Sequence, residues 1–261
     1  MIGSVSNPLL LDQDLAERCN GSPRWTIART AIYSGVIVTV SIATQLFAIV
    51  LTLGVALAGD PELDMDAWFA RPLDTDGLYL SIAAVTSTLV GIPLIGLLAA
   101  RRESNPWSFL GVTPASFRAT MAWCIAIVAL QFAARWLAAV LGQPPSEYMT
   151  TVYQSSSDGA LLALALVAAA PLLEEIFFRG FLLSALESTG IPATAAALAS
   201  ALAWSLMHVQ YSPYDVATIF LMGLMLGAAR SRTRSVVPCI AMHSLNNALA
   251  LAALAAQHAP A

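Results

Sequence analysis

Long stretches that contain almost no charged residue constrain this sequence more than any other feature. A helix needs about 20 apolar residues to cross the hydrocarbon core of a membrane. Seven runs approach or exceed that length, and the sixth is the shortest. They cover residues 30–59, 77–100, 119–142, 159–186, 192–210, 216–229 and 236–256. The sequence therefore predicts an all-α, polytopic membrane helix bundle of about seven transmembrane helices, with six to eight possible.

The composition agrees with a membrane protein in contact with a lipid bilayer. Of the 261 residues, 58% are hydrophobic and 11% are charged, whereas a soluble domain is about half apolar and about a quarter charged. The net charge of −4 offers no basic surface for nucleic acid, which excludes that class of partner. Cys19, Cys124 and Cys239 are far apart and form no pattern typical of a disulfide framework or a zinc site.

The arginines predict the orientation of the chain. All 12 basic residues are arginine, a usage typical of a GC-rich bacterial genome. Nine of them precede the first run, follow the second or separate the sixth from the seventh. With seven spans these positions share one side, and cytoplasmic loops carry the excess of arginine. We therefore expect a cytoplasmic N-terminal segment, residues 1–29, and a single transmembrane domain, residues 30–258, in the bacterial cytoplasmic (inner) membrane.

Polar residues of the fourth, fifth and seventh runs lie deep in their spans. The fourth run contains the segment LLEEIFFRGFL, with Glu174, Glu175 and Arg179. Glu174 lies about 20 Å before the turn that follows, and His208 lies about 24 Å after it. His243 lies about 13 Å in from the last arginines. Because a charge at a helix centre costs about 2.5 to 3.5 kcal/mol on insertion scales, we expect this cluster to be paired, hydrated or functional.

Helical spacing gives the two glutamates different roles. Glu175 and Arg179 are four residues apart and within reach of an ion pair, while Glu174 is rotated by about 100° from them. We expect Glu175 to be held by Arg179 and Glu174 to face a polar cavity, where it can exchange a proton with water. His243 and Asn247 are also four residues apart, and the amide of Asn247 is a neutral donor suited to a developing oxyanion.

Three motifs resemble those of a known family. The segments EEIFFR, WSLMH and HSLNN resemble, in this order, the EExxxR, FxxxH and HxxxN motifs of the CAAX prenyl protease and bacteriocin-processing family, also called the CPBP or Abi family. The resemblance covers about residues 155–255, the family core. The one departure is Trp204, which stands where phenylalanine is usual, and we expect it to change the shape of the pocket.

The resemblance implies an intramembrane endopeptidase of the glutamic type. Its substrate would be a membrane-associated peptide or protein, cut within the bilayer or in a C-terminal tail. The resemblance also implies the catalytic residues and their roles. Glu174 and His208 would activate the attacking water, while His243 and Asn247 would stabilise the oxyanion. The expected supporting residues of the site are Glu175, Arg179 and Trp204.

We expect no cofactor, although zinc is an alternative. Glu174, His208 and His243 make a His₂Glu set, which binds zinc at some catalytic sites, and they would be the ligands of a metal. The sequence has no HExxH motif on one helix. With Glu174 as a ligand, no other carboxylate is obvious as the base, which favours the metal-free mechanism.

A non-catalytic membrane protein is the alternative function. It would be a transporter, or an immunity or scaffold protein, whose polar cluster binds an ion or a partner. A transporter would ideally show inverted repeats or broken helices, and we find neither in the sequence. The oligomeric state stays open.

Three smaller features also have two interpretations each. We expect the side chains of Gln131 and Arg135 to lie at the outer membrane interface, and a contact with the substrate is the alternative. Asn246 is either a second donor in the cavity or a packing residue. Gly223 and Gly227 form a GxxxG motif that predicts close packing within this chain more strongly than a dimer contact.

Overall fold

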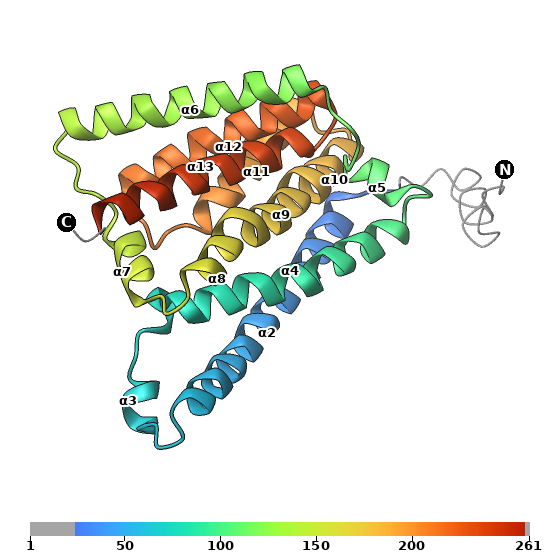
Figure 1. Cartoon of the computed structure of the whole chain (residues 1–261). Coiled ribbons are helices and arrows are strands. Elements are labelled where there is room, and N and C mark those ends of the chain that lie inside the picture. The colour runs from blue at the N-terminus through green and yellow to red at the C-terminus, as the bar shows by residue number, and fades with distance from the viewer. Residues whose placement is uncertain (1–23, 259–261) are drawn as a thin grey trace.

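The computed structural model describes residues 24–258, and within that range every regular element is helical (Figure 1). Most of the expected N-terminal segment, and Cys19 with it, lies outside the described residues. The elements in chain order are α2 (Ile27–Gly59), α3 (Met65–Phe69), the 3-10 helix η1 (Leu73–Thr75), α4 (Gly77–Ala100), α5 (Pro106–Phe109), α6 (Phe117–Val140), α7 (Glu147–Ser155), α8 (Gly159–Ala163), the π-helix η2 (Leu164–Ala169), α9 (Ala170–Glu175), the π-helix η3 (Ile176–Leu182), α10 (Leu183–Ser188), α11 (Ala193–Leu206), α12 (Pro213–Thr233) and α13 (Val237–Gln257).

Short polar side chains set where the long helices begin. The side chains of Thr26, Asp76 and Ser212 accept hydrogen bonds from backbone N–H groups in the first turns of α2, α4 and α12. These N–H groups have no partner within the helix, so the caps satisfy donors that the chain would otherwise leave open. Gly142 and Gly190 adopt positive φ just after α6 and α10, a conformation that glycine reaches without steric cost.

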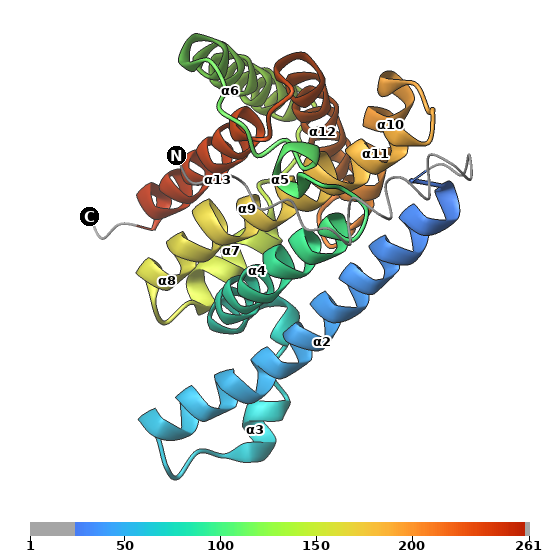
Figure 2. The ribbon, with the colours of Figure 1, turned by 90° about the vertical axis from the view of Figure 1, so that its right-hand side faces the viewer.

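The segment from α8 to α10 is one continuous helix, Gly159–Ser188, and it forms the centre of the bundle. Helices α4, α11 and α13 pack against it, and α11 pairs with α12. Figures 1 and 2 show α2 and α6 on opposite sides of the molecule, where α2 packs mainly on α4 and α6 packs on α12 and α13. The central helix is therefore the element that places side chains between the others.

Outward-facing apolar side chains agree with a membrane setting. Among the described residues, five helices are long and apolar enough to cross a bilayer, namely α2, α4, α6, the helix Gly159–Ser188 and α13. On α2 and α6 the large side chains of Leu46, Phe47, Ile125 and Phe132 are exposed. A soluble surface rarely presents apolar patches of this kind.

The expected count of seven spans is not confirmed. Each of the seven runs contains a helix, but α11 has 14 residues and is about 21 Å long, short of the roughly 30 Å hydrocarbon core. Helix α12 has 21 residues and carries Asp215 near its start and arginines near its end, so it is less apolar than the five candidate spans. The two helices form a hairpin that packs against the centre of the bundle.

The arginine-rich segments share one end of the bundle. The start of α2, the end of α4, the start of α6 and the end of α12 lie at the right of Figure 1. Eight of the nine arginines that predicted a common side lie at or next to those helix ends, and Arg18 lies outside the described residues. That this end faces the cytoplasm remains a prediction from the charge rule.

The GxxxG motif packs within the chain, as expected. A Cβ atom added at Gly223 or Gly227 would lie 3.0 Å from the Cβ of Ala201 or Ala197, respectively, on α11. Real Cβ atoms are rarely that close, so glycine at both positions favours the close approach of α11 to α12. This contact fixes the hairpin that carries Trp204 at its inner face.

Candidate active site

Two π-helical segments, η2 and η3, flank the short α-helix α9 that carries both glutamates. Such segments are rare and are frequent at functional sites. In η2 the N–H of Ala170 bonds to the carbonyl five residues earlier, at Ala165. The next bond of that series would join residue 171 to Leu166, but Pro171 has no N–H. The carbonyl of Leu166 is therefore open to another donor.

Asn247 supplies that donor. Its Nδ2 lies 2.8 Å from the carbonyl oxygen of Leu166, and Nδ2 of Asn246 donates to Oδ1 of Asn247 over 3.2 Å. An amide nitrogen carries two hydrogens, so one is fixed on the backbone and one is left for a further acceptor. Asn246, whose role the sequence left open, thus orients its neighbour.

The expected ion pair between Glu175 and Arg179 is present and fully buried. Arg179 Nη1 lies 2.9 Å from Glu175 Oε1, and both side chains have 0% exposure. The same oxygen lies 2.9 Å from Nδ1 of His243, a contact that the sequence did not predict. A buried charge is stable only when paired, so Glu175 links the EExxxR and HxxxN segments as well as holding Arg179.

Trp204 is the residue that brings the cluster together. Its indole Nε1 donates to Oε2 of Glu174 over 2.5 Å. Its ring is edge-on to the rings of His208 and His243, with centroids 5.2 and 5.3 Å away. The guanidinium of Arg179 lies 4.5 Å from the ring centroid, in a cation–π arrangement. The sequence predicted only a changed pocket shape from Trp204, whereas the structure makes it a hydrogen-bond donor to Glu174.

His208 lies in a turn and not within a span, which corrects the expected run 192–210. Helix α11 ends at Leu206, and Pro213 begins α12. Nδ1 of His208 lies 2.9 Å from the carbonyl oxygen of Trp204, which is four residues earlier in the chain. A carbonyl oxygen only accepts, so Nδ1 carries the hydrogen and Nε2 of a neutral ring has a free lone pair. The turn therefore presents a base next to Trp204.

Tyr211 joins the site from the same turn and was not singled out by the sequence. Its ring lies 5.9 Å from that of His208 and 4.9 Å from that of Tyr148 on α7. Burial, with smaller contributions from the phenol of Tyr148 and the carboxylate of Glu174, raises the pKa of Tyr211. The phenol therefore stays protonated and uncharged at neutral pH.

Two other polar residues do not join the cluster. Gln131 on α6 donates to the sulfur of Met222 on α12 over 3.8 Å. Arg135 is exposed on the outer surface of α6. Neither position places its side chain beside Trp204, so both serve the contacts and the surface of α6.

The suggested zinc ligands do not assemble into a metal-binding group. Within residues 24–258, no three His, Cys, Asp or Glu side chains form a group that could hold a metal ion. Nδ1 of His243 bonds to Glu175 and Nδ1 of His208 bonds to a backbone carbonyl, so each ring keeps Nε2 for a further partner. The metal-free mechanism therefore stays a prediction.

A comparison with protein-family models matches residues 156–249 to the family described as Type II CAAX prenyl endopeptidase Rce1-like. That range includes every residue of the cluster around Trp204. Residues 156–249 of this chain are therefore similar to that family.

This match agrees with the family that the three motifs resemble, and it falls within the expected core, residues 155–255. The matched family is described as an endopeptidase. Three of the five candidate spans, α2, α4 and α6, lie outside the matched range. Comparisons with the curated proteins and with the solved structures found no match to this chain.

Proposed function

We propose that this chain is an intramembrane endopeptidase in which Glu174 and His208 activate water without a metal. The carboxylate and the imidazole both contact one side chain, Trp204, and this common contact is the observation that carries the proposal. The indole N–H occupies one carboxylate oxygen of Glu174 and orients the carboxylate, since hydrogen bonds to a carboxylate are strong. The second oxygen and the free Nε2 of His208 then share the proton that the attacking water gives up.

His243 and Asn247 form the oxyanion site in this proposal. With Nδ1–H on Glu175, a doubly protonated His243 ring offers Nε2–H as the second donor. Asn247 offers the amide hydrogen that Leu166 does not use. Both donors are held by buried partners before the substrate arrives, and preorganised donors of this kind stabilise the developing oxyanion most.

Glu175 lies beside two basic side chains. Its Oε1 accepts from Nη1 of Arg179 and from Nδ1 of His243, each over 2.9 Å. Glu175 therefore orients His243 while it neutralises Arg179. A residue that orients a catalytic imidazole in this way fixes its tautomer and its position.

The substrate in this proposal is a membrane-associated peptide or protein, cut within the bilayer or near its C-terminal tail. Helix α11 ends at Leu206, and the turn that follows carries His208 beside the exposed apolar side chains of Met207 and Val209. A peptide bond that enters from the lipid would meet Glu174 there. We place the protein in the bacterial cytoplasmic membrane with its N-terminus in the cytoplasm, following the arginine distribution.

Membrane proteomics of peptide termini tests this proposal without a substrate chosen in advance. Cells that carry the wild-type chain are compared with cells that carry Glu174→Gln, which keeps the size of the side chain and removes its charge. The control is Glu147→Gln, because Glu147 is exposed at the start of α7 and outside the cluster. New termini that depend on Glu174 and not on Glu147 support the protease. Termini that persist in Glu174→Gln would instead favour a transporter, scaffold or immunity protein.

A further inference from the structure

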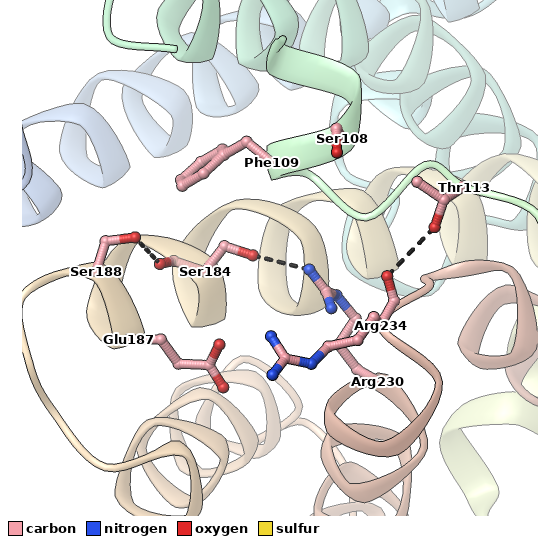
Figure 3. Close-up of a pocket in the computed structure, with 8 residues that line it drawn as sticks. All are labelled: Ser108, Phe109, Thr113, Ser184, Glu187, Ser188, Arg230 and Arg234. Carbon is pink, nitrogen blue, oxygen red and sulfur yellow. Dashed lines mark hydrogen bonds between the residues drawn. The ribbon is translucent and has the colours of Figure 1, made fainter. Parts of the chain in front are cut away.

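A cavity of about 470 Å³ lies at the arginine-rich end of the bundle, away from Trp204. Figure 3 shows its lining residues on α5 and its following loop, on α10 and at the end of α12. Two guanidinium groups, four hydroxyl groups and one carboxylate face this space. Such a lining is polar and mainly basic, in a chain where only 11% of the residues are charged.

Arg230 is the fixed cation of this cavity. Its exposure is 6%, Nε donates to the carbonyl of Arg179 over 3.1 Å, and Nη2 donates to Oγ of Ser184 over 3.0 Å. Gly111 makes room for it, because a Cβ atom there would lie 2.7 Å from the guanidinium. A guanidinium carries five N–H donors, and these two bonds leave others for a ligand.

Arg234 is the second cation, at the mouth of the cavity. Its backbone is left-handed, with φ of 57° and ψ of 20°, and its N–H closes α12 on the carbonyl of Arg230. The hydroxyl of Thr113 donates to the carbonyl of Arg234 over 3.3 Å. Figure 3 shows its guanidinium turned back beside that of Arg230 and opposite Glu187. The two cations therefore face the same space.

The charges in the cavity do not cancel. Arg230 and Arg234 contribute two positive charges and Glu187 contributes one negative charge, so one positive charge is left over. A singly charged phosphodiester would neutralise it, and guanidinium groups and hydroxyls are its usual donors. Basic pockets between helices at the cytoplasmic side of a membrane protein bind phospholipid head groups.

We propose that this cavity binds a phosphate group, carried by a phospholipid head group or present as free phosphate. Arg230 and Arg234 provide the charged donors, and the hydroxyls of Ser108 and Ser184 line the same space. The net charge favours a phosphodiester over inorganic phosphate, whose charge is larger. The site is separate from Glu174 and His208, and it does not depend on the proposed protease activity.

Lipid binding by the purified full-length chain tests the proposal. In phosphate-free detergent, native mass spectrometry measures bound short-chain phosphatidylglycerol, and thermal unfolding is followed with phosphatidylglycerol, diacylglycerol or inorganic phosphate. We expect saturable binding and a raised unfolding temperature with phosphatidylglycerol, and no effect of diacylglycerol, which lacks the phosphate. If inorganic phosphate also raises the unfolding temperature, the site binds phosphate in either form. If only inorganic phosphate raises it, the site binds the free ion.

Two arginine variants decide whether the binding belongs to this cavity. Arg234→Gln removes an exposed side chain at the mouth, and we expect the affinity to fall about tenfold, as for the loss of one charged hydrogen bond. Arg232→Gln is the control, because Arg232 is exposed on the same helix end and lies over Trp123, 5.6 Å from the ring centroid. Equal losses in both variants, no loss in Arg234→Gln, or no binding of either phosphate would overturn the proposal.

Discussion

Trp204 donates its indole N–H to Oε2 of Glu174, with 2.5 Å between the two atoms. The motif that this segment resembles usually has phenylalanine at that position, which could keep the ring contacts but has no donor. The same ring touches His208, His243 and Arg179. The tryptophan thus adds a bond to the proposed base, and this bond can be removed while the aromatic ring is retained.

Trp204→Phe is expected to slow cleavage by about ten- to a hundredfold, because a hydrogen bond to a charged group is worth about 1.5–3 kcal/mol. The measurement is the cleavage rate at saturating substrate in proteoliposomes, with the unfolding temperature measured in parallel. Trp136→Phe is the matched control, since Trp136 is exposed on α6. A full rate in Trp204→Phe would show that Glu174 does not need the indole N–H.

Glu175→Gln is expected to destabilise the protein by about 3–5 kcal/mol, because it leaves the buried Arg179 without its counter-charge. The free energy of unfolding is measured by denaturant titration in mixed micelles. Glu174→Gln provides the contrast, since Glu174 is half-buried and its partner is a neutral indole. We expect Glu174→Gln to lose cleavage and keep most of its stability. Equal stability of Glu175→Gln and the wild type would contradict the structural role of this ion pair.

The sequence predicted those parts of the site that depend on spacing along one helix. Glu175 and Arg179 form the expected i,i+4 pair, even though Arg179 lies in a π-helical segment. The all-helical fold and the packing of Gly223 against α11 also follow from local patterns. Periodicity carries this information because neighbours on a helix are fixed by the backbone alone.

The contacts between helices could not be read from spacing. The bond between His243 and Glu175 joins residues 68 positions apart, and the bond between Trp204 and Glu174 joins residues 30 apart. The π-helical segments shift the phase of the central helix, and apolar periodicity does not mark where they begin. Pro171 was a signal of irregular structure, because a proline within a helix leaves a carbonyl without its donor.

Removal of metal ions is expected to leave activity unchanged. The proposed mechanism assigns the proton transfer to Glu174 and His208, and the indole of Trp204 already bonds to one oxygen of Glu174. The measurement is cleavage before and after chelation and dialysis, together with the zinc content of the purified protein. Stoichiometric zinc that is lost together with activity, and that restores activity when added back, would assign these residues to a metal centre.

Asn247→Ala is expected to lower the cleavage rate by about a hundred- to a thousandfold, as for the loss of one oxyanion donor. It should also lower stability by about 1–3 kcal/mol, because the carbonyl of Leu166 loses its partner. The rate is measured in proteoliposomes and the free energy of unfolding in micelles. Asn246→Ala is the neighbouring control, and we expect a smaller effect on rate because Asn246 only orients Asn247.

The double variant Pro171→Ala/Asn247→Ala separates the two roles of Asn247. Alanine at position 171 restores the backbone N–H that the π-helical pattern would direct to Leu166, so the carbonyl regains a donor. We therefore expect the double variant to recover stability relative to Asn247→Ala while its cleavage rate stays low, because the oxyanion donor is still absent. Recovery of both properties would mean that Asn247 acts only through the helix, and the proposed oxyanion site would then rest on His243 alone.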